Sequence, residues 1–138
     1  MVLVDGKGVP LGVHLSSASP AEASLAEATL DKVAVPRRRG RPRKNPDRII
    51  ADRGYDWHSL WKRMKDRGID LIAPHLSTRR NRYQDGRKLR RYRRRWIVER
   101  TNAWLFNFRR LVVRYENKLE NYRAFLHLAC ALIALRQF

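Results

Sequence analysis

The sequence predicts an α/β fold in which helices flank a mixed sheet and the C-terminal part is helical. Within residues 1–73, short apolar stretches bounded by turn residues alternate with longer helical patterns. The remainder of the chain contains helix-forming patterns almost throughout. The predicted order is strand, strand, helix, strand, helix, strand, helices. Such an order is typical of a sheet with mixed strand directions.

The first elements are expected to be a hairpin and a helix. Residues 1–5 and 9–17 are largely apolar, and a Gly-Lys-Gly turn separates them. Residues 21–30 are good helix formers. Ser19 is placed to cap this helix and Pro20 to occupy its first position.

Residues 35–46 differ in kind from their neighbours. They include six cations within eight residues, a density of charge that cannot be buried. We therefore expect a mobile basic loop.

The middle of the chain predicts a second strand–helix–strand unit. Residues 48–52 form a brief apolar strand that ends in a carboxylate, and residues 69–73 form another strand. Between them, a helix over residues 57–67 is expected to end at Gly68.

The C-terminal part is expected to contain one long helix over residues 89–115 and a final apolar helix over residues 119–136. Because His127 and Cys130 belong to the apolar helix, we expect both to be buried or half-buried. A single cysteine excludes an intrachain disulfide and a cysteine-built zinc site.

Composition indicates a polyanionic partner. The chain contains 31 Lys plus Arg and 13 Asp plus Glu, which gives a formal net charge of +18. Nucleic acid is the usual partner of so basic a domain, and a membrane surface is the rival. No stretch approaches the roughly 20 apolar residues of a spanning helix, and the first residues do not resemble a signal peptide. We expect a cytoplasmic protein without a membrane partner.

Two carboxylates are distinguished by their context. Asp52 follows a short apolar strand, where α/β sheets present functional side chains. Glu99 lies in an arginine-rich helix, away from the main apolar face. Taken alone, Asp52 fits a turn or cap residue, and Glu99 fits a solvated partner of Arg95. Spacing by itself leaves both interpretations open.

Longer sequence motifs around Asp52 and Glu99 favour a functional role for both carboxylates. Ala-Asp-Arg-Gly-Tyr-Asp at residues 51–56, together with Tyr-x-x-Arg-x-x-x-Glu at residues 92–99, resembles the DDE transposases of bacterial insertion sequences, most of all insertion-sequence family five. Residues 106–116 and 121–129 resemble the tail of the same family. The resemblance covers nearly the whole chain from Val4 onward.

This resemblance implies a ribonuclease-H-like fold and a triad of two aspartates and one glutamate. Asp52 matches the second aspartate and Glu99 the glutamate, while Tyr92 and Arg95 match the residues that accompany that glutamate. Where the broader superfamily often has a lysine, this chain has Phe106, which puts the expected DNA contact there in doubt.

The implied chemistry is metal-dependent phosphodiester cleavage and strand transfer. Two divalent ions about 3.5–4 Å apart stabilise the attacking and leaving oxygens. Mg²⁺ prefers carboxylate oxygens, so the resemblance implies Mg²⁺ or Mn²⁺ held by Asp52 and Glu99. Arg95 is expected to hold a phosphate bidentately and Tyr92 to hydrogen-bond one.

The family's first aspartate is expected to lie outside this chain. Asp5 matches the hairpin turn of the family rather than the catalytic position. Residues 1–138 would then be a partial ribonuclease-H-like catalytic domain without its first strand and N-terminal DNA-binding region. A second-frame product and a truncated remnant both remain open. We expect an upstream transposase segment as partner, a homo-oligomer in the synaptic complex, a nucleoid-associated location, and no activity of the isolated chain.

The basic residues predict contacts with the phosphates of insertion-sequence ends and target DNA. Besides Tyr92, Arg95 and the arginine-rich residues 87–95, the candidates are Arg37, Arg38, Arg39, Arg41, Arg43, Lys44, Arg79, Arg80, Arg82, Arg109 and Arg110.

Two other functions remain open. The chain could be a DNA-binding module that occupies element ends and competes with active transposase. It could also be a small basic RNA-binding protein, although the strand-end carboxylate paired with a helix glutamate argues against that reading.

Overall fold

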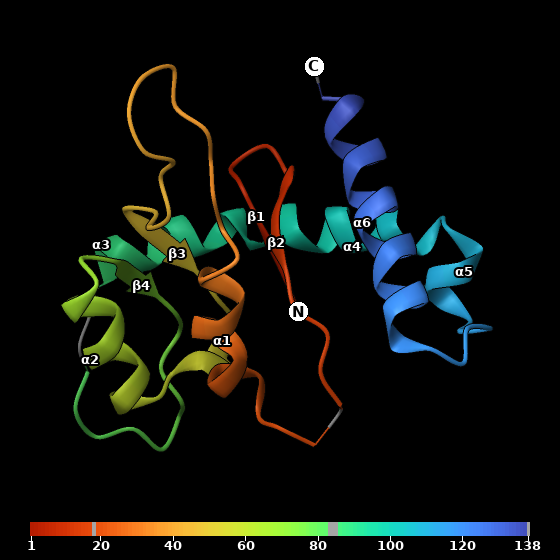
Figure 1. Cartoon of the computed structure of the whole chain (residues 1–138). Coiled ribbons are helices and arrows are strands. Elements are labelled where there is room, and N and C mark those ends of the chain that lie inside the picture. Colours follow the sequence, from red (N-terminus) through yellow and green to blue (C-terminus); the bar gives the residue numbers. More distant parts are fainter. Residues whose placement is uncertain (18, 83–85, 138) are drawn as a thin grey trace.

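The computed structural model describes residues 1–17, 19–82 and 86–137. The α/β class is confirmed, because short strands and helices alternate along the chain (Figure 1). Within the described residues the strands form two separate two-stranded sheets, so the expected single mixed sheet is wrong. One sheet pairs β1 and β2 antiparallel, and the other pairs β3 and β4 parallel. The strands are β1 (Val2–Val4), β2 (Pro10–Val13), β3 (Arg48–Ile50) and β4 (Asp70–Ile72).

Helices cover both sheets, and two segments are short 3₁₀ helices. The arginine-rich 3₁₀ helix η2 contacts β3, and α4, which continues from it, contacts β1, so together they cross behind both sheets (Figure 1). The helices are α1 (Glu22–Leu30), η1 (Arg53–Tyr55), α2 (His58–Asp66), α3 (Gly86–Leu89), η2 (Arg90–Arg95), α4 (Trp96–Phe106), α5 (Arg109–Val112) and α6 (Leu119–Leu135).

The predicted hairpin is confirmed, and its turn rests on α4. Asp5 Oδ1 accepts hydrogen bonds from the amides of Lys7 (2.8 Å) and Val9 (2.9 Å), as expected of a turn residue. Gly8 has a φ of 90°, and a Cβ there would lie 2.9 Å from Thr101 Oγ1. The Thr101 hydroxyl donates to the Gly8 carbonyl at 2.8 Å, which fixes the turn against the helix.

The start of α1 differs from the prediction. Ser19 and Pro20 lie in a bend before the helix, and Ala21 occupies the cap position without a side-chain hydrogen bond. The Ser24 hydroxyl instead donates to the Ala21 carbonyl at 2.6 Å. Ala23, the second residue of the helix, is the first that enters the core.

Two apolar clusters form the core, one at each end of the molecule. The first joins the hairpin to the C-terminal helices and contains Val13, Leu105, Leu111, Leu126, Ala129 and Ile133. The second joins α1, α2 and β4 and contains Ala23, Leu30, Leu60, Met64, Ile69 and Leu71. Leu30, Leu60, Met64 and Leu71 of the second cluster also line the space between the two sheets.

The expected long helix over residues 89–115 is interrupted twice. Residues 90–95 form η2, in which like charges at i and i+4 would destabilise an α-helix. The helix α4 then ends at Phe106, and Phe108 has extended backbone angles. This second break lets Phe108 and Leu111 turn into the C-terminal cluster.

The last helix, the helix over residues 57–67 and its end at Gly68 (φ 72°) are confirmed. Cys130 is half-buried as expected, but His127 is exposed. Only one face of α6 packs on the hairpin and α4, and His127 lies outside it. Among the described residues, no helix is long and apolar enough to cross a membrane.

The basic loop is tied at its base and protrudes from the fold (Figure 1). Val35 and Arg43 pair as an antiparallel bridge, with backbone hydrogen bonds of 2.9 and 2.8 Å. Arg37, Arg38, Arg39, Arg41 and Lys44 are all exposed. The mobility of this loop stays a prediction.

Candidate catalytic groove

A groove of about 810 Å³ lies between the two sheets. All three residues of β1 line it, as do all three residues of β3. Within the described residues each of these strands pairs only with its partner in its own sheet. The edges of β1 and β3 that border the groove therefore carry backbone donors and acceptors with no strand opposite them.

The walls of the groove differ in character. On the side of α1 and α2 they are apolar and include Ala26, Leu30, Leu60 and Met64. On the side of η2 and α4 they are charged, with Arg91, Arg94, Arg95 and Glu99 at the rim. The groove thus has an apolar interior and a charged border.

Asp52 lies at the end of β3, on the border of the groove. Its Oδ1 accepts a hydrogen bond from the Gly54 amide at 2.8 Å and caps η1. The turn interpretation is therefore correct for one oxygen of the carboxylate. Asp52 also lines a shallow hollow of about 540 Å³ together with Tyr92, Pro74 and Leu89. The structure thus brings Asp52 and Tyr92 to one depression.

Glu99 projects from the first turn of α4 and borders the same groove as Asp52. Its side chain is 54% exposed, and its Oε1 accepts a hydrogen bond from Arg95. The Arg95 guanidinium also lies 5.7 Å from the centre of the Tyr92 ring. The ion-pair interpretation of Glu99 is therefore observed, and Tyr92, Arg95 and Glu99 form one contiguous set as the helical spacing predicts.

The residues at the groove fit a hard divalent cation in type but not in number. Asp52 and Glu99 are carboxylates, the oxygen ligands that Mg²⁺ prefers. In the described part of the chain, however, no group of three or more His, Cys, Asp or Glu side chains is close enough to hold a metal ion. A complete site would need at least one further ligand.

Glu22 also lines the groove, as do Asp5 and Asp47, and the sequence did not single it out. Burial first, and then the charges of Glu22 and Asp52, raise the pKa of the Tyr55 phenol. No local pattern in the sequence joins Glu22 to Asp52. Only the packing of α1 against η1 does so.

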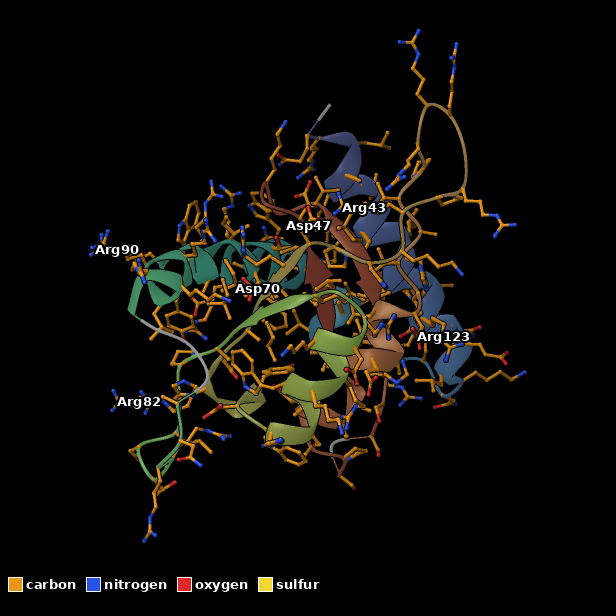
Figure 2. The ribbon with its side chains drawn as sticks, turned by 90° about the vertical axis from the view of Figure 1, so that its left-hand side faces the viewer. Arg43, Asp47, Asp70, Arg82, Arg90 and Arg123 are labelled. Carbon is orange, nitrogen blue, oxygen red and sulfur yellow. The ribbon has the colours of Figure 1, made fainter. Side chains whose placement is uncertain are left out.

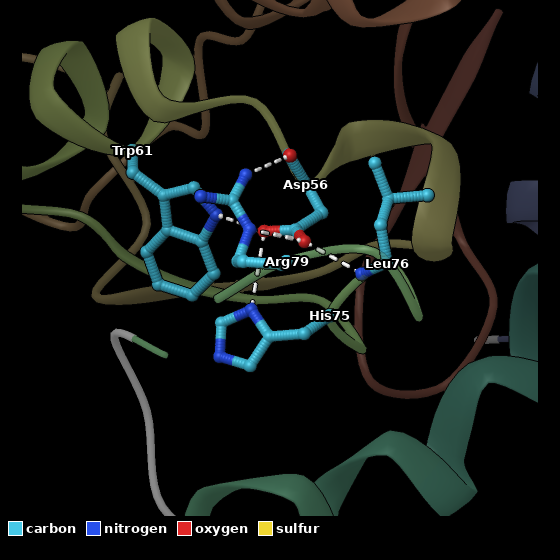
Figure 3. A network of polar contacts seen from close by, with 5 residues as sticks. All are labelled: Asp56, Trp61, His75, Leu76 and Arg79. Carbon is cyan, nitrogen blue, oxygen red and sulfur yellow. Dashed lines mark hydrogen bonds and ion pairs between the residues drawn. The ribbon is translucent and has the colours of Figure 1, made fainter. Parts of the chain in front are cut away.

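Asp56 forms a buried network that sequence reasoning also missed (Figure 3). Its side chain accepts from Trp61 Nε1 (3.1 Å), the Leu76 amide (2.7 Å) and Arg79 Nε (2.7 Å), and His75 Nδ1 lies 3.2 Å away. Arg79 also donates to the Asp56 carbonyl. Burial by itself raises the pKa of Asp56, but the Leu76 amide, Arg79 and His75 together hold it below its ordinary value.

The predicted DNA-binding residues fall into two groups. Four of them already contact carboxylates: Arg79 binds Asp56, Arg43 binds Asp47, Arg95 binds Glu99, and Arg110 binds Glu116. The exposed ones are spread over the basic loop, the segment after β4 and the start of α5. They are Arg37, Arg38, Arg39, Arg41, Lys44, Arg80, Arg82 and Arg109.

Figure 2 shows that basic side chains extend outward from the fold, including Arg82 in the segment after β4 and Arg90 at the start of η2. The basic side chains that line the groove come from the end of the basic loop, from β3 and from η2. They are Arg43, Lys44, Arg48, Arg91, Arg94 and Arg95.

Comparison with known proteins defines the family. The family model described as "Transposase DDE domain" matches residues 1–134. The chain is 38% identical over 133 residues to a Burkholderia cepacia protein named "Putative transposase for insertion sequence element IS402". The match covers 96% of this chain and 60% of that relative, so the chain spans about three fifths of the relative's length. No solved structure matches. The chain therefore belongs to the transposase DDE domain family.

Proposed function

We propose that this chain provides two of the three catalytic carboxylates of an insertion-sequence transposase, and that a segment from outside the chain completes its ribonuclease-H-like sheet. The observation that supports this proposal is the groove between β1 and β3, which Asp52 and Glu99 both border. The completed protein would cleave and transfer DNA strands.

The groove suits an added strand better than a small ligand. An extended segment between β1 and β3 would satisfy the backbone groups of both edges at once. Its apolar side chains would pack against half-buried apolar residues of the groove walls, such as Ala26 on one side and Val98 on the other. Such a strand would join the two sheets into one.

The missing ligand would come from the same segment. A strand that carries an aspartate at the end nearest Asp52 would bring a third carboxylate to the border of the groove. The relative is longer than the part that this chain matches, so members of the family contain residues beyond the matched region.

Mg²⁺ or Mn²⁺, when bound, would stabilise the charge on the attacking and leaving oxygens. Asp52 and Glu99 would hold the metal. Glu99 would first have to exchange its contact with Arg95 for the metal, which would free Arg95 to bind a phosphate. Tyr92 would donate a hydrogen bond to DNA across the hollow that it shares with Asp52.

The proposal is tested by co-producing this chain with the polypeptide encoded immediately upstream, in each of the two possible frames. We expect metal-dependent cleavage of a DNA duplex that contains the element end, from the complex but not from the isolated chain. Asp52→Asn and Glu99→Gln should each reduce the rate by more than the 10–100-fold that loss of an outer metal partner typically costs.

Two results would overturn the proposal. One is metal-dependent cleavage by the isolated chain that Asp52→Asn abolishes, because the two carboxylates would then suffice. The other is a soluble complex whose activity survives both substitutions. A matched control is Asp66→Asn, which changes an exposed carboxylate of α2 that lines neither the groove nor the hollow.

A second function rests on the exposed arginines rather than on the groove. A chain with a net charge of +18 and a protruding basic loop can bind DNA ends without cutting them and compete with active transposase. DNA binding that survives the double substitution Asp52→Asn and Glu99→Gln would support this role. Self-association, expected of a synaptic complex, would be measured by light scattering with and without DNA.

A further inference from the structure

The helix α6 is apolar on two opposite faces. Its inner face buries Leu126, Ala129 and Ile133 in the C-terminal cluster. Its outer face carries exposed apolar side chains and lies at one edge of the molecule (Figure 1). Four of these side chains form a line along the helix, here called the outer stripe: Ala124, Leu128, Ala131 and Leu135. A helix that is apolar all round is typical of a buried helix, so a partner is expected to cover this face.

The outer stripe is uncharged, although the chain as a whole is strongly charged. Asp, Glu, Lys and Arg make up 32% of the sequence, yet residues 124–135 contain none of them. Leu128 and Leu135 are 56% and 70% exposed, and Leu132 beside them is 40% exposed. The outward face of a surface helix normally carries polar and charged residues. The outer stripe therefore differs from the basic surfaces that suit DNA.

The outer stripe has the spacing of two paired helices. Its residues follow one another at steps of four, three and four, which is the a/d repeat of a coiled coil. Alanine and leucine alternate along it. If two copies pair antiparallel about a two-fold axis between Leu128 and Ala131, each leucine meets an alanine, because Leu128 lies opposite Ala131 and Leu135 lies opposite Ala124. The stripe is thus self-complementary, as the interface of a two-fold dimer must be.

Charge at the two ends of α6 favours the antiparallel direction. Glu120 lies in the first turn, and Arg136 follows the last residue of the helix. In a parallel pair Arg123 and Arg136 would each face the same residue of the other copy. In the antiparallel pair Glu120 lies within about one turn of the level of Arg136 of the other copy, where it offsets part of the repulsion from Arg123. The two helix dipoles also oppose each other.

Other occupants fit the outer stripe less well. DNA or an acidic protein segment would be attracted to the arginines of the basic loop and η2 rather than to uncharged leucines. The strand proposed for the groove would lie elsewhere, because all of α6 is described and none of its residues lines the groove. A second copy of the chain is therefore the occupant that the stripe fits best.

We propose that the outer stripe of α6 is a dimer interface, on which a second copy of this chain docks through the same stripe in the antiparallel direction. The inference goes beyond the proposed function, since the pairing needs neither metal, nor DNA, nor the added segment. A single helix pair buries less than the roughly 800 Å² per partner of a standard interface. The dimer is therefore expected to be weak, with a dissociation constant in the micromolar range.

The test uses the full 138-residue chain, freed of nucleic acid by nuclease treatment and ion exchange. Sedimentation equilibrium measures its average mass over a series of concentrations. We expect this mass to rise with concentration from 16.3 kDa toward twice that value. Added salt should strengthen the association, because it screens the repulsion between two chains that each carry a net charge of +18. Association bridged by DNA would instead weaken as salt is added.

Substitutions locate the interface. Leu128→Glu places a charge at the centre of the outer stripe and should weaken dimerisation by at least about 10-fold, as loss of a central interface residue does. Leu135→Glu, at the end of the stripe, should act in the same direction. The matched control is Leu76→Glu, the same change at a leucine that is 41% exposed in the segment after β4, and it should leave dimerisation unchanged. Circular dichroism at a concentration where every variant is monomeric shows whether the fold is intact.

The distance between two spin labels measures the direction of pairing. The label is attached through Gln137→Cys in a Cys130→Ala background, so that each chain has one labelled site. With a rise of about 1.5 Å per residue, the two labels lie about 20–25 Å apart in the antiparallel register. In a parallel pair they would lie about 10 Å apart, the separation of two packed helices.

A chain that stays monomeric at every concentration would overturn the proposal, as would a dimer that Leu128→Glu and Leu135→Glu leave intact. A short distance between the labels would overturn the antiparallel register. A dimer that forms only on DNA would also contradict the proposal and would assign self-association to the basic surfaces. Loss of binding to the upstream polypeptide in Leu128→Glu, with no dimer of the unmodified chain, would overturn it and assign the outer stripe to that polypeptide.

Discussion

Asp52 and Asp56 stand four residues apart, on either side of η1, yet their environments are opposite. Asp56 is 1% exposed, and its carboxylate is bonded to three side chains and a backbone amide. Asp52 borders an open groove and accepts one turn hydrogen bond. Two identical side chains in one short motif thus have different tasks.

The difference follows from where each donor comes from. The partners of Asp56 lie on α2 and in the segment after β4, so this carboxylate fastens two parts of the fold together. Within residues 1–17, 19–82 and 86–137, Asp52 accepts only from the local Gly54 amide, through Oδ1. A buried carboxylate with all its donors present stabilises structure, whereas an exposed, partly bonded one can bind a ligand.

The largest expected effect is on stability at Asp56. Asp56→Ala should lower the free energy of unfolding by about 3–5 kcal/mol, because it leaves Arg79 buried without its partner. Asp52→Asn should change it by less than about 1 kcal/mol. Urea denaturation followed by circular dichroism measures both. Similar losses at the two positions would remove the distinction between them.

Adjacent arginines offer the next comparison. Arg79 is held by Asp56, whereas Arg80 is exposed. Arg79→Ala should destabilise the fold by about 1–3 kcal/mol. Arg80→Ala should instead preserve stability and, if Arg80 contacts a phosphate, reduce the salt slope of duplex binding by about 0.9. A loss of stability at Arg80 or an unchanged stability at Arg79 would contradict this assignment.

The depressed pKa of Asp56 predicts that stability depends on pH, with a smaller effect than that of the substitutions above. The pKa of Asp56 in the folded state is depressed. The contribution of its charge to the free energy of unfolding is therefore fully present above the unfolded-state pKa of about 3.9. This contribution is lost as pH falls through the folded-state pKa. Each unit of depression corresponds to about 1.4 kcal/mol. The difference in unfolding free energy between the unmodified chain and Asp56→Asn should therefore shrink below about pH 4. A constant difference down to pH 2 would show that charge at Asp56 contributes nothing.

The smallest effect is expected at the exposed pair Arg95 and Glu99. Arg95→Ala should change stability by less than about 0.5 kcal/mol, because exposed pairs at i and i+4 contribute little. In the completed protein the same substitution should weaken DNA binding. A large loss of stability would make Arg95 a structural residue and would weaken its proposed role at a phosphate.

Local patterns predicted the elements well. The hairpin, the end of α2 at Gly68 and the final helix all depend on neighbouring residues, so turn chemistry and apolar spacing suffice. The start of α1 was missed, and so were the breaks around α4, which charge repulsion and burial decided. The candidate site was predicted only as far as motif residues lie close in sequence, as Tyr92, Arg95 and Glu99 do on the consecutive helices η2 and α4.

By itself the sequence determined the basic character of the chain and its α/β class, and it predicted Asp52 and Glu99 as catalytic carboxylates. Only the tertiary structure separated Asp52 from Asp56, divided the strands into two sheets around a groove, and left the outer stripe of α6 exposed. The physical reason is the distance along the sequence over which each kind of interaction acts. Periodicity and turn chemistry act over a few residues, whereas burial, strand pairing and long-range hydrogen bonds depend on segments that meet only after the chain has folded.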